Sequence, residues 1–305
     1  MLAFITRRLF QGIFVLFSVL VVVFFLARLS GEPLALFVPV GATADDVARI
    51  RAQLGFDQPL LVQLGAFLSG VLRGDFGTSL RFHQPAMQLV LEVLPATVHL
   101  TLSAMLIVIV VGIPLGVIAA LKRNTAVDAL VMSLALVGQS MPTFWLGVLL
   151  ILVFGVNLAV LPPFGYNEPA ALVLPAITLA AISLGIIARS VRSSMLEVIN
   201  QDYMRTARAK GLTPIQLVAK HALRNALIPA LTVLGLQVGT LLGGAVVTEF
   251  VFSFPGMARL ATQAVLNRDF PIVQAFVAVI AVAVLVVNLL VDVIYAVVDP
   301  RITYR

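Results

Sequence analysis

The chain is notable first for having no cysteine and few charged residues. The absence of cysteine from its 305 residues excludes disulfides, thiolate metal sites and thiol catalysis. Charged residues make up 11% and hydrophobic residues 61% of the chain, whereas soluble domains carry about a quarter charged and about half apolar residues. The mean hydropathy is +1.09. This composition is typical of a membrane protein.

Motifs that would let the chain act as an enzyme are also missing. It has no G-x-x-x-x-G-K-[ST] sequence, so it cannot supply the phosphate-binding loop of an ATPase. There is no His-Glu-x-x-His, no serine lies in a Gly-x-Ser-x-Gly turn, and His83, His99 and His221 fall in different compartments or depths. The net charge of +6 does not indicate nucleic acid, because the basic residues follow the positive-inside bias of membrane proteins.

Apolar stretches long enough to cross a membrane occur six times. About 20 helical residues span a hydrocarbon core, and the stretches are Leu9 to Leu29, Ala96 to Leu121, Val127 to Leu158, Ala171 to Ala188, Ala226 to Phe250 and Ile272 to Val298. The first follows Arg7 and Arg8 but is too long for the apolar part of a signal peptide, and no A-x-A cleavage site directly follows its apolar run. We therefore expect an uncleaved first span.

The distribution of basic residues predicts the orientation. With both termini in the cytoplasm, thirteen Lys and Arg residues lie inside and seven outside, most of the seven in one long loop. The connection at 159–170 carries no basic residue, which agrees with an external position. We predict three regions: an N-terminal transmembrane helix at 1–30, an external amphipathic helical region at 31–95, and a five-helix core at 96–305 with a cytoplasmic loop at about 190–225.

The external region has helix signals of its own. Thr43 is a candidate N-cap, acids follow it in the first turn, and Gly55 is a natural stop. A second amphipathic stretch starts at Gln58 and runs through Leu72. These patterns fit either two helices lying on the outer membrane surface or a docking platform for a soluble external partner.

The cytoplasmic loop is polar but strongly patterned. Gly211 is a natural C-terminal stop for the helix that leads up to it. Thr213 is then a candidate N-cap, Pro214 occupies the first helical position, and Gln216 completes the spacing of a capping box. The pattern predicts a helix, a sharp glycine turn and a second helix. On these signals alone the hairpin is either a basic surface element or a docking element for a cytoplasmic partner.

The sequence of this hairpin resembles that of a known family. Asp202-Tyr-Met-Arg-Thr-Ala-Arg-Ala-Lys-Gly-Leu212, followed by His221-Ala-Leu-Arg-Asn-Ala-Leu-Ile-Pro229, is similar to the coupling-loop motif of binding-protein-dependent ABC transporter permeases. The general motif is Glu-Ala-Ala, three residues, Gly, and Ile-x-Leu-Pro after nine more. Arg205 stands at its acidic position, and His221 and Arg224 stand where Ile and Pro are expected. These departures are typical of the dipeptide, oligopeptide and nickel branch.

The resemblance covers nearly the whole chain. Other segments that look like the same branch are Arg7-Arg8, Asp45 to Gly55, Gly74-Asp-Phe-Gly-Thr-Ser79, Leu94-Pro-Ala-Thr97, Met141-Pro-Thr-Phe-Trp145, Phe254-Pro-Gly256 and Asp299-Pro-Arg301. The long external region after the first span resembles the B-type subunit, one of two non-identical permeases. The resemblance implies an all-α membrane protein of type I (MetI-like) architecture with six transmembrane helices, in a bacterial or archaeal cytoplasmic (inner) membrane.

The resemblance also implies what the chain works with. The expected partners are a second homologous permease subunit, two ABC ATPase subunits, an external solute-binding protein and membrane lipid. ATP and Mg²⁺ are expected in the ATPases, with no cofactor and no catalysis in this chain. The ATPase is expected to contact Tyr203, Arg205, Thr206, Ala207, Arg208, Ala209, Lys210, Gly211, Leu212, Thr213 and Pro214. Peptides, nickel complexes and related small solutes all remain open as substrates.

Small and polar residues inside the spans are the remaining candidates. Gly235, Gly239 and Gly243 recur every four residues, which favours close helix packing. Polar residues in spans are costly, and those expected to line the translocation path are Gln139, Ser140, Gln237 and Thr240. Asp292 offers the alternative of a stand-alone secondary transporter or channel, or it pairs near the cytoplasmic end. Glu249 is expected to be hydrated near the outer boundary.

Overall fold

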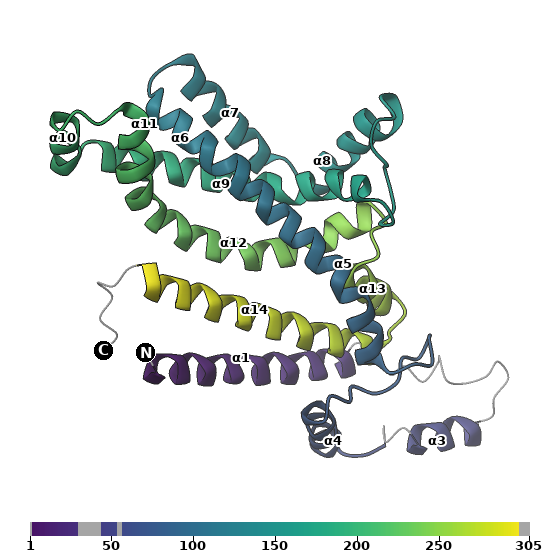
Figure 1. Ribbon diagram of the computed structural model, residues 1–305. Helices are drawn as coiled ribbons and strands as arrows, with labels where there is room; N and C mark the ends of the chain where they lie inside the picture. The colour runs from purple at the N-terminus through teal and green to yellow at the C-terminus, as the bar shows by residue number, and fades with distance from the viewer. Residues whose placement is uncertain (1, 30–43, 54–56, 299–305) are drawn as a thin grey trace. The chain divides into compact units, whose positions relative to one another are not determined.

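The computed structural model describes residues 2–29, 44–53 and 57–298, and every secondary-structure element longer than a single bridge within those ranges is a helix. The β pairing found there is an isolated bridge between Thr78 and Pro85. Among the described residues, five helices are long and apolar enough to cross a membrane, or six if a pair bent by 107° counts as one broken span. The all-helical membrane fold predicted from the sequence is therefore confirmed (Figure 1).

The chain divides into two compact units, Met1–Ala96 with Pro255–Leu285 and Thr97–Phe254 with Val286–Arg305. In the first unit, α1 (Leu2–Leu29) runs beside the first part of α14 (Phe270–Val298), as Figure 1 shows. Its core is apolar, and its buried members are Leu20, Phe76, Ala86, Val90, Met257, Ala264, Ile272, Ala275 and Ala278. The first span and the start of the last one therefore share one apolar core.

The segment of the first unit that was predicted to be external contains the two predicted helices. They are α3 (Ala44–Gln53) and α4 (Leu60–Leu72); the predicted cap Thr43 and stop Gly55 lie outside the described residues. Phe67 of α4 stacks on Phe24 of α1, with ring centroids 5.5 Å apart. This aromatic contact ties α4 to the first span.

A hydrogen-bond network joins the loop at 79–82 to the residue just before α14. Asp269 is 1% exposed, and its Oδ2 accepts from Ser79 Oγ at 2.6 Å and from the Arg81 backbone N–H at 3.3 Å. The hydroxyl of Ser79 in turn accepts from the Phe82 backbone N–H at 3.0 Å. A buried carboxylate that receives such bonds fixes the loop geometry, because leaving it unbonded would be costly.

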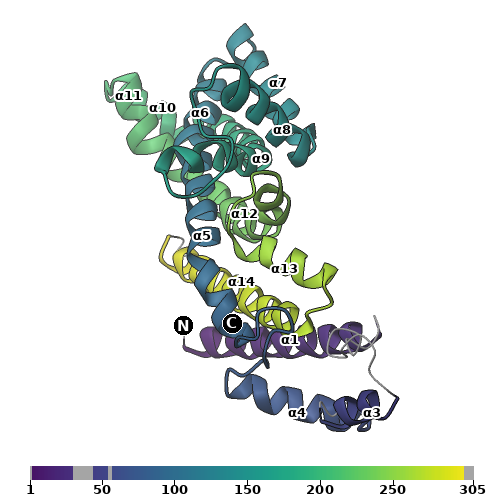
Figure 2. The ribbon, with the colours of Figure 1, turned by 90° about the vertical axis from the view of Figure 1, so that its right-hand side faces the viewer.

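The second unit is built around α9. Helix α5 (Ala86–Ile107) begins in the first unit and continues into the second, whereas α13 (Met257–Leu266) belongs to the first unit. The other membrane elements of the second unit are the π-helical η1 (Val108–Gly112), α6 (Ile113–Leu121), α7 (Ala126–Ser140), α8 (Thr143–Leu150), the π-helical η2 (Ile151–Asn157), the 3₁₀ turn η3 (Pro169–Leu172), α9 (Val173–Ile199) and α12 (Leu223–Val251). Helix α9 packs against α6, α7 and α12 (Figure 2). Its side chains are accordingly among the most buried in the chain.

Close approach of backbones explains how α9 packs so tightly. A Cβ built on Gly185 of α9 would lie 2.4 Å from the carbonyl oxygen of Ala135 on α7. A Cβ on Gly116 of α6 would lie 2.5 Å from the carbonyl oxygen of Ala188 on α9. Small residues permit such contacts between membrane helices. The three helices α6, α7 and α9 therefore pack as one bundle, each in contact with the other two.

The stretch Val127 to Leu158, read from the sequence as one span, is broken in the structure. Helix α7 ends at Ser140, and α8 begins at Thr143 with its axis turned by 107°. Met141 is extended, at φ −75° and ψ 131°. The cause is local, because the residue before a proline is disfavoured in the helical region.

Candidate functional site

The predicted cytoplasmic hairpin is present in the structure. It consists of α10 (Asp202–Ala209), a turn at 210–213, α11 (Pro214–Gln216) and the π-helical η4 (Leu217–Ala222), which continues into α12. Helix α9 ends at Ile199, and only two residues separate it from the start of α10. In Figure 1 the hairpin protrudes beyond the ends of α9 and α12. A short rigid connection therefore links it to the membrane helices.

The turn has the geometry that its sequence predicts. Gly211 has φ +78°, in the left-handed region that favours glycine. Thr213 Oγ1 accepts from the Gln216 backbone N–H at 3.4 Å, and the Thr213 backbone N–H donates to Gln216 Oε1 at 3.1 Å. The capping box is complete, with Pro214 in the first turn. These local signals are confirmed by the structure.

The hairpin has its own small core and a polar outer face. Met204 is 0% and Ala207 7% exposed on α10, and Leu217 and Ala222 on η4 are also buried. Ala209 is exposed, so it and not Ala207 offers bare backbone to a partner. The other predicted coupling residues are exposed except for partly buried Leu212; they are Tyr203, Arg205, Thr206, Arg208, Lys210, Gly211, Thr213 and Pro214.

Side-chain bonds fasten the hairpin to the start of α12. Asn225 Nδ2 donates to the Tyr203 hydroxyl at 3.0 Å and to the His221 carbonyl oxygen at 2.9 Å. The exposed Arg205 also lies 3.7 Å from Asp202 within α10. Arg208, Lys210 and Lys220 add positive charge to the surface. The hairpin is therefore a hydrogen-bonded, positively charged protrusion whose charge is complementary to an acidic protein surface.

The predicted path residues lie in different settings. Gln237 is buried on α12, and its Oε1 accepts from Ser183 Oγ of α9 at 2.9 Å. Thr240 and Ser140 are exposed. Gln139 is partly buried, and its Oε1 has no hydrogen-bond partner among the described residues. The structure thus places Gln237 in a helix interface, whereas Ser140 and Thr240 face outward.

The three predicted packing glycines also differ from one another. A Cβ on Gly235 would lie 2.4 Å from Val291 Cγ1, so this glycine permits a close contact inside the second unit. No described atom lies within 4 Å of a Cβ built on Gly239 or Gly243. Both are exposed on the same face of α12 as Leu236, which is 67% exposed. This face is available to another helix.

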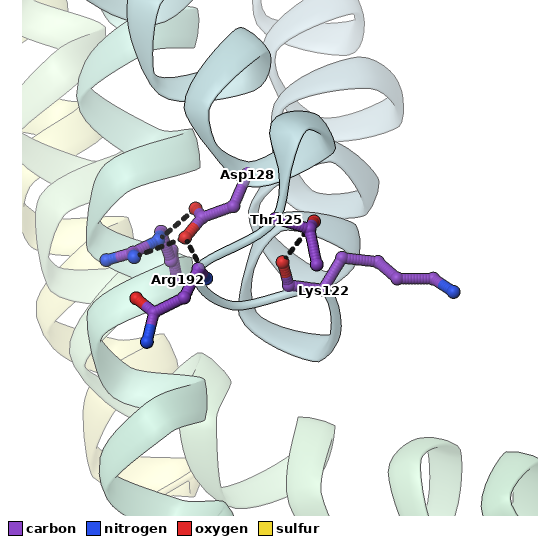
Figure 3. A network of polar contacts seen from close by, with 5 residues as sticks. Lys122, Thr125, Asp128 and Arg192 are labelled. Atoms are coloured by element: carbon purple, nitrogen blue, oxygen red, sulfur yellow. Dashed lines mark hydrogen bonds and ion pairs between the residues drawn. The ribbon is translucent and has the colours of Figure 1, made fainter.

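Two buried acids were not predicted from the sequence. Glu249, expected to be hydrated, is 0% exposed and accepts from Thr97 Oγ1 at 2.6 Å. Asp128 is also buried and pairs with Arg192 of α9 (Figure 3). The partners lie far apart in the sequence, so no local spacing signals them. For Asp292, the candidate for ion coupling, the side chain lies outside the described residues.

No group of three His, Asp or Glu side chains gathers as a metal site would require, within the part of the chain that the structure describes. The geometry instead provides a capped, basic hairpin that is attached directly to the ends of packed membrane helices.

Comparison with known proteins gives this geometry a family context. The family described as binding-protein-dependent transport system inner membrane component matches residues 112–304, and its N-terminal companion matches residues 1–101. A Brucella abortus (strain 2308) protein named as a peptide transport system permease protein is 44% identical, covering 100% of both chains. The glutathione transport system permease protein GsiC of Salmonella typhimurium (strain LT2) is 42% identical, also covering 100% of both chains.

Solved structures agree on the fold. Two crystal forms of the inward-facing MetNI methionine ABC transporter match with TM-scores of 0.58 and 0.60, at 23% and 24% identity. Each match covers 70% of this chain and 97% of the other. The chain belongs to the family of binding-protein-dependent transport system inner membrane components, as a permease subunit of an ABC importer.

Proposed function

We propose that this permease forms half of the pore of an ATP-driven importer for short peptides or related small solutes. The observation that carries the proposal is the α10–α11 hairpin, which is capped, basic and exposed at the end of the packed membrane helices. The substrate class follows the relatives, since the names of those 42% and 44% identical specify peptide and glutathione transport. Both solutes are built from amide-linked amino acids.

In this proposal the hairpin receives force from one of two cytoplasmic ATPase subunits. ATP and Mg²⁺ bind those partners, because this chain has no phosphate-binding loop. Contact with the ATPase falls on the exposed residues of 203–214. Arg205, Arg208 and Lys210 provide charge complementarity, and the exposed Ala209 allows close approach. Both chain termini and the hairpin then lie on the cytoplasmic side, as the basic residues favour.

A second, homologous permease would complete the pore against α12. Lipid tails are as apolar as leucine, so lipid-facing positions gain nothing from glycine. Gly239 and Gly243 nevertheless lie open on a face that also carries Thr240. A partner helix that packs there would use the space left by both glycines. Thr240, and Ser140 at the α7–α8 break, are the polar groups we place nearest the path.

An ATP-driven importer accounts for more of the chain than an ion-coupled transporter would. The family is dependent on a binding protein, so an external solute-binding protein is the expected source of substrate, and the region 31–95 is its proposed docking platform. A secondary transporter at Asp292 would leave the capped hairpin without a role.

The test uses the absence of native cysteine. Ala209→Cys places one thiol on the exposed face of α10 for a short photo-crosslinker, and Leu72→Cys, 89% exposed on α4, is the matched external control. In native membranes, Ala209→Cys should capture a P-loop ATPase in a manner that ATP alters, and the control should not. Failure to capture an ATPase with a folded, labelled Ala209→Cys protein would refute the coupling role. ATP-driven uptake of a labelled dipeptide into proteoliposomes of the complete transporter tests the substrate class.

A further inference from the structure

Asp128 and Arg192 form a bidentate ion pair between α7 and α9. Arg192 Nε donates to Asp128 Oδ1 at 2.6 Å, and Nη2 donates to Oδ2 at 2.7 Å. The Asn124 backbone N–H also donates to Oδ2, at 3.0 Å. Figure 3 shows this network beside the turn where Thr125 Oγ1 donates to the Lys122 carbonyl oxygen at 2.6 Å. The carboxylate therefore holds both α9 and the α6–α7 turn.

The pair occupies a mechanically important place. Arg192 lies seven residues before Ile199, the end of α9, which is about two helical turns. Helix α10, the proposed contact for the ATPase, begins at Asp202. Asp128 lies in the first turn of α7, where helix N-terminal N–H groups favour a carboxylate. Force that enters through α10 reaches this pair before it reaches the middle of α9.

The pair is not needed merely to bring the helices together. Gly185 of α9 already meets the Ala135 backbone of α7, and Gly116 of α6 meets the Ala188 backbone. Packing contacts of this kind include no directional bond between side chains. A bidentate Arg–carboxylate pair instead fixes distance and orientation. It therefore adds resistance to shear at the cytoplasmic ends of the helices.

We propose that Asp128 and Arg192 are positioning residues that make α6, α7 and α9 move as one body when the hairpin is pulled. The proposal rests on the proposed function, because it needs force to arrive at α10. The pair stays closed throughout the cycle and carries the movement of α9 to α7 and on to the α7–α8 break. Without the ion pair, the end of α9 moves while α6 and α7 stay in place, and ATP is hydrolysed without transport.

The experiment measures dipeptide uptake per ATP hydrolysed in proteoliposomes that contain the complete transporter and its binding protein. Asp128→Asn removes the charge with little change of shape, and Arg192→Lys keeps the charge but loses the two-pronged geometry. We expect uptake per ATP to fall about 5-fold or more in both, the lower end of coupling between distant sites. Arg123→Gln, which removes a neighbouring exposed charge, is the matched control and should leave the ratio unchanged.

A covalent rescue separates clamping from folding. In the cysteine-free chain, Asp128→Cys with Arg192→Cys lacks the ion pair, and a short bis-methanethiosulfonate then ties α7 to α9. Crosslinking should restore uptake per ATP, and reduction should abolish it again. If the tie blocks transport, or leaves the ratio low, the permanently closed clamp is wrong.

The outcomes also separate this proposal from the function on which it rests. A wild-type transporter that shows no ATP-driven uptake refutes the proposed function itself. A coupled wild type with an equally coupled Asp128→Asn refutes only the clamp. A variant that yields less folded complex but unchanged uptake per ATP shows a purely structural pair and likewise overturns it. Should Asp128→Asn fail to fold, Arg192→Lys gives the same decision.

Discussion

Replacing Gly185 with alanine should loosen the packing of α7 on α9. The added Cβ would lie 2.4 Å from the Ala135 carbonyl oxygen, 3.2 Å from its carbonyl carbon and 3.4 Å from its Cα. All three atoms belong to the backbone, so no side-chain rotation can relieve the clash. Since ordinary contact begins near 3.4 Å, the two helices must separate by about 1 Å (3.4 − 2.4) at this point.

The expected magnitude follows from two opposing terms. Alanine improves helix propensity over glycine by about 0.5–1 kcal/mol. Overpacking costs about 1–3 kcal/mol, and the upper part of that range applies because a 1 Å gap forfeits a quarter to a half of each dispersion contact around it. The free energy of unfolding of Gly185→Ala should therefore fall by about 1–2 kcal/mol net.

The assay is steric trapping of the purified permease in bicelles, which gives an equilibrium free energy of unfolding. Gly239→Ala is the matched control on α12, because no described atom lies within 4 Å of its added Cβ. In the isolated permease it should gain about 0.5–1 kcal/mol from helix propensity alone. Equal stability of Gly185→Ala and wild type would refute the 2.4 Å contact between a Cβ at position 185 and the Ala135 carbonyl oxygen.

Three further predictions concern the hairpin and are checked by amide hydrogen exchange of residues 202–222. Gly211→Ala, at φ +78°, should destabilise the turn by about 1 kcal/mol, and unchanged exchange would contradict the left-handed turn. Thr213→Ala removes the acceptor for the Gln216 N–H and should cost about 1 kcal/mol of local stability; equal protection would mean that the capping box contributes nothing. Tyr203→Phe removes the acceptor used by Asn225 and should cost about 0.5 kcal/mol, whereas protection equal to wild type would show that this exposed bond does not fasten the hairpin.

The hairpin could be predicted because its signals are local. Gly211, Thr213, Pro214 and Gln216 lie within six residues, and each has a backbone requirement that its neighbours complete. The membrane spans could be predicted for a similar reason, since the hydropathy of about 20 residues decides each one. The sequence marks a helix break at Met141 because Pro142 follows it. The 107° angle between α7 and α8 depends on packing that one sequence does not specify.

The buried polar pairs could not be predicted because their partners are remote. Thr97 and Glu249 are separated by 152 residues, and Asp128 and Arg192 by 64. A single acid near the end of a span looks the same in sequence whether it faces water or a hydroxyl group of another helix. The interface role of Gln237 was missed for the same reason, since its partner Ser183 lies on α9.

The contacts of α9 with its neighbours explain why movement of this helix cannot be local. Gly185 meets α7, whereas Ser183 bonds to Gln237 of α12. Two residues along a helix are separated by about 200° around its axis, so these contacts lie on nearly opposite faces. A helix held on both sides cannot shift without carrying or losing both neighbours. In the proposed mechanism, force on the hairpin therefore meets a packed body rather than a single helix, and the Asp128–Arg192 pair closes that body at the end where the force enters.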